Sequence, residues 1–216
     1  MTAYSANSTP SFLSPPVTVE DIYLDSPLRL GVLASGSGSN FEAIATAIES
    51  GQLNATIPVL IYNKPKAKVT ERAKRFNVPA LLHNHRDYPT REALDRQIVE
   101  TFQSHGVDWV IMAGWMRIVT PVLLEAFRDR ILNIHPSLLP SFPGIHGIEQ
   151  ALEAGVKITG CTVHIAQEKV DSGPIIMQAA VPILPDDTPE TLHQRVQVQE
   201  HKIFPQAIAL AAKQFR

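Results

Sequence analysis

The chain of 216 residues is predicted to be an α/β protein with a doubly wound, mostly parallel sheet. Two observations predict this class. From Leu28 onward, short apolar segments alternate with segments of helical spacing, and residues 107–114 (VDWVIMAG) form a continuous apolar run, as in a parallel strand covered on both faces. Two further apolar segments after Gly144 are separated by only a short loop, so we expect an antiparallel C-terminal extension of the sheet.

The first half of this domain is predicted to alternate between strand and helix three times. Strands are expected where apolar and β-branched residues gather, at 28–35, 56–63 and 78–84. Helices are expected at 40–49, 65–76 and 90–104. Gly51 closes the first helix, and Thr90 is the candidate N-cap of the third.

In the second half, the alternation of strands and helices is predicted to give way to an antiparallel pair of strands and a final helix. Strands are expected at 107–114, 130–136, 157–166 and 173–183. Short helices are expected at 121–127 and 146–155. Asp187 or Thr188 is the candidate N-cap of the last helix, with Pro189 near its first position, and Pro205 is expected to kink or divide that helix.

The domain organisation follows from composition. Residues 1–27 are rich in Ser, Thr and Pro and lack Lys and Arg, so they fit neither a secretory signal nor a transit peptide. We interpret residues 1–27 as a flexible N-terminal tail and residues 28–216 as one domain.

Charge and cysteine content restrict the class of protein. A formal net charge of -2 argues against a broad basic surface for nucleic acid or for an anionic membrane. Cys161 is the one cysteine, so no internal disulfide is possible, and no apolar run is long enough to span a bilayer. The pair of histidines at 83–85 (HNH) has no second pair of suitable spacing, so no metal site is predicted. These features predict a soluble intracellular protein, which we place in the cytoplasm.

The turn at 34–40 (ASGSGSN) joins a predicted strand to a predicted helix. Its glycines allow a close backbone approach, and the helix N-terminus offers unpaired N–H groups to an anion. The third glycine and the acidic residue of a dinucleotide fingerprint are missing, and so is the Lys-Ser/Thr pair of a P-loop. A phosphate monoester held by Gly38, Ser39 and Asn40 is favoured over an ordinary tight turn.

The segment 132–144 (LNIHPSLLPSFPG) places two polar residues at the carboxyl end of a strand. Asn133 and His135 are two positions apart and therefore project from the same face, at the edge where open α/β sheets bind ligands. An amide can stabilise an oxyanion and an imidazole can move protons, although a lone strand histidine is often structural. Asp171, in the loop at 167–175, is a candidate to orient His135, although Asp before Ser-Gly is also ordinary turn chemistry.

Five longer segments carry these residues in a compact order: GVLASGSGSN, AGWMRIVTP, LNIHPSLLPSFPGIHGIEQALEAG, TGCTVHIAQEKVDSGPIIMQ and RVQVQEHKIFP. Together they resemble the phosphoribosylglycinamide formyltransferase family, the folate-dependent enzymes of purine synthesis, from Leu28 to the C-terminus. The resemblance implies a Rossmann-like formyltransferase fold. It also implies transfer of the formyl group of the co-substrate 10-formyltetrahydrofolate to the amine of 5-phosphoribosylglycinamide (GAR), without a metal, by a monomer or homodimer.

The resemblance assigns roles to individual residues. It implies that Asn133, His135 and Asp171 are catalytic and that GAR is bound by Gly38, Ser39, Asn40 and Glu200. It implies that the folate is bound by Arg91, Met116, Arg117, Ile118, Val119, Gln167, Glu168, Lys169 and Val170. The sequence departs from the pattern of the family at Trp115 and in the segment 145–150 (IHGIEQ). Both positions are expected at the rim of the implied pocket.

Two alternative functions remain open. In one, water is the acceptor of the formyl group, and in the other, the protein is not an enzyme. A 10-formyltetrahydrofolate hydrolase uses a similar core with water as acceptor, but that family carries an N-terminal regulatory domain that residues 1–27 cannot supply. A phosphate-binding module without catalysis could use the turn at 34–40 alone. Such a module would not need Asn133, His135 or Asp171.

Overall fold

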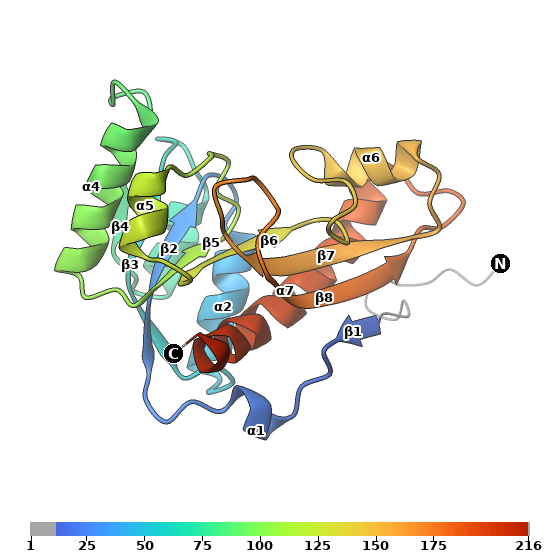
Figure 1. Ribbon diagram of the computed structural model, residues 1–216, viewed down its shortest axis with the longest axis horizontal. Coiled ribbons are helices and arrows are strands. Elements are labelled where there is room, and N and C mark those ends of the chain that lie inside the picture. The colour runs from blue at the N-terminus through green and yellow to red at the C-terminus, as the bar shows by residue number, and fades with distance from the viewer. Residues whose placement is uncertain (1–11, 216) are drawn as a thin grey trace.

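The computed structural model describes residues 12–215 and is organised around a twisted sheet with helices on both faces (Figure 1). The described strands lie in the order β1-β8-β7-β6-β5-β2-β3-β4. Their bounds are β1 Phe12–Ser14, β2 Leu28–Ala34, β3 Ala55–Tyr62, β4 Ala80–Leu82, β5 Trp109–Met112, β6 Ile131–His135, β7 Ile158–Ile165 and β8 Ile175–Pro182. The five strands β2 to β6 are parallel, whereas β7, β8 and β1 pair antiparallel. The predicted fold class is confirmed.

The helices divide between the two faces. Their bounds are α1 Val19–Ile22, α2 Ser39–Glu49, α3 Val69–Arg75, α4 Arg91–Ser104, α5 Pro121–Ala126, α6 Gly147–Glu153 and α7 Pro189–Gln214. Helices α2, α3 and α7 cover one face and α4 and α5 cover the other (Figure 1). Along β5, Ile111 packs on the α2 and α7 side and Val110 on the α4 and α5 side. Both faces are buried, which explains the continuous apolar run of this strand.

The long closing helix α7 runs through Pro205 without a break. Of the two predicted outcomes, the division of the helix at Pro205 is therefore wrong, and the kink stays a prediction. Pro205 itself is buried, and its neighbours Phe204 and Ile208 are fully buried in the core beneath the sheet. Packing of this apolar face stabilises the helix on both sides of the missing N–H. Thr188 is the N-cap, with Pro189 at the first position as predicted.

Residues 12–27, which belong to the segment predicted to be a flexible tail, pack against the domain. Strand β1 pairs with the edge strand β8, with Leu13 opposite Ala179, and Leu24 is 1% exposed. Helix α1 begins with a capping box between Thr18 and Asp21. An unpaired edge of β8 favours such an added strand, so residues 12–27 are part of the fold. Residues 1–11 lie outside the described residues.

The loops that follow β2, β5 and β6 come together at the carboxyl edge of the parallel strands. They comprise the turn at 35–38, the loop at 113–120 and the loop at 136–146. This is the edge at which open α/β sheets place ligands. Between residues 12 and 215, no helix is long and apolar enough to cross a membrane.

Candidate active site

A cavity of about 730 Å³ lies at this edge of the sheet. This volume is in the range of small-molecule sites. Most of the predicted site residues line it: Gly38, Ser39, Asn40, Met116, Arg117, Ile118, Val119, Asn133, His135, Gln167, Val170, Asp171 and Glu200. The tertiary structure therefore joins segments that are far apart in the sequence into one pocket.

Three of the residues that the resemblance assigned to the folate do not line this pocket. Arg91 is the exposed first residue of α4, and Glu168 and Lys169 are exposed in the loop before β8. A second cavity, of about 690 Å³, lies at the opposite ends of the strands and is lined by residues 25–28, 108–109, 128–130, 212 and 215. It contains none of the predicted site residues.

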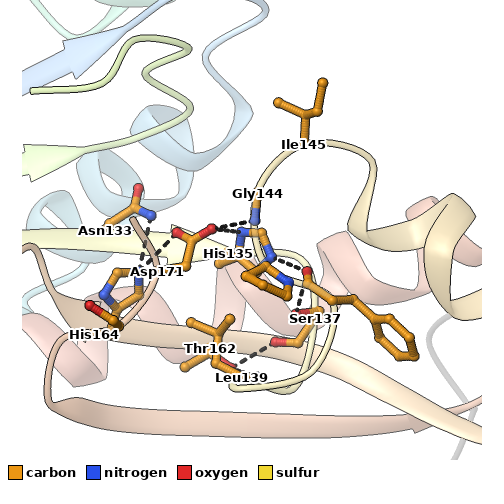
Figure 2. Close-up of polar contacts among 12 residues, drawn as sticks. Asn133, His135, Ser137, Leu139, Gly144, Ile145, Thr162, His164 and Asp171 are labelled. Carbon is orange, nitrogen blue, oxygen red and sulfur yellow. Dashed lines mark hydrogen bonds and ion pairs between the residues drawn. The ribbon is translucent and has the colours of Figure 1, made fainter. Parts of the chain in front are cut away.

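The floor of the pocket is built by the adjacent strands β6 and β7. Asn133 and His135 project from the same face of β6, as their spacing predicts, and they stand opposite His164 and Thr162 in the antiparallel register. Figure 2 shows the polar contacts that join Asn133, His135, His164 and Asp171.

His135 is 4% exposed and has an oxygen atom near each ring nitrogen. Its Nε2 lies 2.8 Å from the carbonyl oxygen of Phe142, and its Nδ1 lies 3.4 Å from Oδ2 of Asp171. A neutral imidazole can donate at only one of its nitrogens, whereas an imidazolium donates at both. Since a carbonyl oxygen only accepts, Nε2 of His135 donates to Phe142, and Nδ1 faces the carboxylate of Asp171.

Asp171 is held at the centre of this group. The backbone N–H of Gly144 donates to its Oδ2 at 2.7 Å, and its Oδ1 lies 3.5 Å from Nε2 of His164. Burial by itself raises the pKa of Asp171, but the hydrogen bonds from His164 and Gly144 and the charge of His135 together lower the pKa below its usual value. The backbone of Asp171 has φ 52°, a left-handed conformation that Asp tolerates better than most residues. Asp171 is therefore present as a carboxylate at neutral pH.

His164 is a site residue that the sequence analysis missed. Its Nδ1 lies 2.9 Å from the carbonyl oxygen of Ile165, and its Nε2 lies 3.1 Å from Nδ2 of Asn133. A carbonyl oxygen only accepts, so Nδ1 of His164 donates to Ile165, while Nε2 lies between the amide of Asn133 and the carboxylate of Asp171. The signal was present, because Thr162 and His164 alternate along a strand as Asn133 and His135 do.

The turn at 35–38 forms the second polar end of the pocket. Gly38 is the N-cap of α2 and has φ 77°, and a Cβ atom there would lie 2.4 Å from Cγ2 of Val69. Only glycine fits this position. The turn is held from α3, where Val69 N donates to Gly36 O at 3.1 Å and Arg72 Nε donates to Ser37 O at 2.9 Å. The N-terminus of the 11-residue helix α2 is thus presented to the pocket.

Helix α7 contributes a carboxylate beside this turn. Nδ2 of Asn40 donates to Oε2 of Glu200 at 3.0 Å, and Nε2 of Gln197 donates to Oγ of Ser39 at 3.1 Å. Burial raises the pKa of Glu200, although the hydrogen bond from Asn40 and the charge of His193 act in the opposite direction. Gln197 and His193 also line the pocket and were not predicted.

The remaining wall of the pocket is an apolar rim, which we define as Met116, Ile118, Ile145 and Val170. These four side chains line the cavity and are 63%, 54%, 68% and 45% exposed, in that order. Large apolar side chains gathered around a cavity indicate a ligand with an extended apolar surface. Trp115 lines the same cavity and is buried.

The sequence and the fold match those of known proteins. A family model described as Formyl transferase matches residues 28–208. The chain belongs to the formyl transferase family. It is 44% identical over 180 residues to the phosphoribosylglycinamide formyltransferase of Bacillus subtilis, covering 83% of this chain and 92% of that protein.

Two further relatives are a solved structure with the same fold and a much longer protein that this chain matches over one segment. The crystal structure of glycinamide ribonucleotide transformylase 1 from Symbiobacterium toebii has a TM-score of 0.86 and 48% identity, covering 88% of this chain and 90% of that chain. The human trifunctional purine biosynthetic protein adenosine-3 is 44% identical over 184 residues, which are 85% of this chain and 18% of that protein. The family predicted from the five sequence segments is confirmed.

The residues that the sequence analysis set aside have structural partners in this fold. His83 bonds Tyr88 and Thr101 through its two ring nitrogens, at 2.9 and 3.2 Å, and His85 bonds the carbonyl oxygen of Asn63 at 2.9 Å. Cys161 is fully buried, and burial raises the pKa of its thiol well above the usual value. The hydrogen bonds of His83 and His85 hold the loop after β4. Cys161 is a core residue of β7.

Proposed function

We propose that the protein transfers the formyl group of 10-formyltetrahydrofolate to the amine of GAR, giving formyl-GAR and tetrahydrofolate in purine biosynthesis. The names of its relatives in Bacillus subtilis and Symbiobacterium toebii support GAR as the acceptor of the formyl group, and the resemblance to the family implies the folate as its donor. The observation that carries the proposal is the grouping of Asn133, His135 and Asp171 at the floor of one pocket. Asp171 lies 3.4 Å from His135, and His164 links Asp171 to Asn133. A module that only binds phosphate would not need this group.

GAR is proposed to lie between α2 and α7. Its phosphate sits at Gly38, Ser39 and Asn40, where the N-terminus of α2 favours an anion. The carboxylate of Glu200 accepts hydrogen bonds from the ribose hydroxyls. The amine of GAR then reaches toward the polar floor of the pocket.

The folate is proposed to lie along the apolar rim. The loop at Met116–Val119 covers one side of its ring system, and Gln167 and Val170 cover the other. We leave Arg91, Glu168 and Lys169 out of this site, because they do not line the cavity. This placement brings the formyl group to Asn133 from the side opposite GAR.

In the reaction, the neutral amine of GAR attacks the formyl carbon, and the formyl oxygen becomes an oxyanion. An N–H of the Asn133 amide donates to this oxygen, and a protonated His135 stabilises it further. Losing one such donor typically costs about 2.7–4 kcal/mol of barrier. The amine resembles an α-amino group, so roughly a tenth of it is neutral at pH 7.

Asp171 then transfers the proton that the reaction moves from GAR to the folate. The nitrogen of GAR must lose one proton after attack, and the departing folate nitrogen must gain one. Asp171 is ionised and contacts His135, so its carboxylate accepts the proton directly or through water. The same group returns the proton to the leaving nitrogen.

A spectrophotometric assay tests the proposal. The loss of 10-formyltetrahydrofolate is followed with the purified chain, with and without GAR, and the product is identified by mass spectrometry. Consumption that depends on GAR, with formyl-GAR as product, supports the transferase. Equal consumption without GAR would assign the hydrolase reaction instead, and no consumption in either case would contradict both reactions.

A further inference from the structure

Ser35 lies where the two proposed substrate sites meet. It is the first residue after β2, it is 2% exposed, and it opens the turn that leads to Gly38. Its backbone N–H donates to the carbonyl oxygen of Gly114 at 3.1 Å. Its hydroxyl oxygen accepts the backbone N–H of Met116 at 2.9 Å.

These two bonds join the phosphate turn to the loop at 113–120, which carries half of the apolar rim. Of the two, only the bond to Met116 depends on the Ser35 side chain. The far end of the same loop has a separate anchor. There, Asp95 on α4 accepts the backbone N–H of Thr120 at 2.6 Å, and Asp95 lies outside the pocket and the phosphate turn.

We propose that Ser35 is a positioning residue that couples the two substrate sites, so that GAR and folate strengthen each other's binding. This inference rests on the proposed function. A phosphate bound at Gly38 and Ser39 restricts the turn, and the Ser35 hydroxyl carries that restriction to Met116. The folate then binds a loop that is already ordered and loses less conformational entropy.

Coupling of this kind is reciprocal and has a measurable size. Coupling free energies between two sites typically correspond to roughly 5–150-fold changes in affinity, and each ligand must change the other's affinity by the same factor. We expect the dissociation constant of tetrahydrofolate to fall at least about fivefold when GAR is saturating. In Ser35→Ala, which removes the acceptor of the Met116 N–H, we expect less than about a twofold change.

Titration calorimetry with tetrahydrofolate makes this measurement, because the reaction product lacks the formyl group and cannot react. Asp95→Ala is the matched control. It releases the other end of the loop, so tetrahydrofolate should bind more weakly with and without GAR by the same factor. Thermal unfolding of each variant verifies that it is folded.

Hydrogen exchange adds a readout that a general loss of stability would not reproduce. Binding of GAR alone should slow exchange of the Met116 amide in the wild-type protein and not in Ser35→Ala. An unchanged coupling factor in Ser35→Ala would overturn the inference while wild-type formyl transfer stands. Absence of formyl transfer by the wild-type protein would instead reject the proposed function.

Discussion

The polar floor and the apolar rim of the pocket are built in opposite ways. Three residues of the floor, Asn133, His135 and His164, lie on two strands, and the fourth, Asp171, lies in the loop after β7. Hydrogen bonds and ion pairs interlock the four residues. The rim lies on loops and exposes about half or more of each large apolar side chain. Rigid strands hold reacting groups within the small tolerances that chemistry requires, whereas apolar contact requires area more than direction.

This difference predicts how variants separate. Changes in the floor should lower kcat, because its groups act on charges that develop during the reaction. Changes in the rim should raise KM for the folate and leave kcat nearly unchanged. Variants that mix these effects would show that the two regions are not distinct.

The largest effect is expected for Asp171→Asn. The amide cannot take up a proton and loses the charge that faces His135 and His164. Replacing an orienting carboxylate by its amide in another catalytic triad lowers kcat by about 10⁴, and we expect a loss of at least about 10³ here. Steady-state kinetics measure it, with the exposed Asp186→Asn as a control expected to match wild type. A loss of less than about threefold would remove Asp171 from the catalytic group.

The next largest effect is expected for Asn133→Ala. The variant removes the donor to the developing oxyanion, so kcat should fall by about 10²–10³. KM for both substrates should stay within about threefold, because the donation strengthens only in the transition state. A rise of KM with an unchanged kcat would mean that Asn133 serves binding and belongs functionally with the rim.

A smaller effect is expected for Ile145→Ala in the rim. The side chain is 68% exposed and should be partly covered by the folate. Losing roughly 1 kcal/mol of apolar burial raises KM for the folate about fivefold, with kcat within about twofold. Ile158→Ala is the matched control, because Ile158 is 60% exposed and does not line the cavity. A large loss of kcat in Ile145→Ala would contradict the expected difference between the floor and the rim.

The smallest effects concern stability and pH at two carboxylates. The lowered pKa of Asp171 means that its contribution to folding is present above the unfolded pKa and is lost as the pH falls through the folded pKa. The raised pKa of Glu200 means that its contribution is present below the unfolded pKa and is lost as the pH rises through the folded pKa.

Denaturant unfolding at a series of pH values measures both contributions. The stability of wild type relative to Asp171→Asn should decrease toward acid pH. The stability of wild type relative to Glu200→Gln should decrease as the pH rises. The same slope for both carboxylates would contradict the difference between the catalytic floor and the ribonucleotide end of the pocket.

Much of the fold and part of the site of this protein could be predicted from the sequence alone. The alternation of strands and helices, the double burial of β5, and the shared face of Asn133 and His135 follow from local periodicity, which a reader of the sequence can count. The glycines of the turn at 34–40 follow from its place between a strand and a helix, where the backbone must approach a ligand closely. These features depend on neighbouring residues in the chain or on the rule that helices cover both faces of a parallel sheet.

Only the tertiary structure decided the rest. Asp171 meets His135 and His164 because β6 and β7 pair antiparallel, and no local pattern states that register. Strand β1 depends on the open edge of β8, and the unbroken helix at Pro205 depends on packing beneath the sheet. The bond between Ser35 and Met116 joins residues that are 81 positions apart. Contacts between distant residues depend on how whole elements pack, and local propensity does not contain that information.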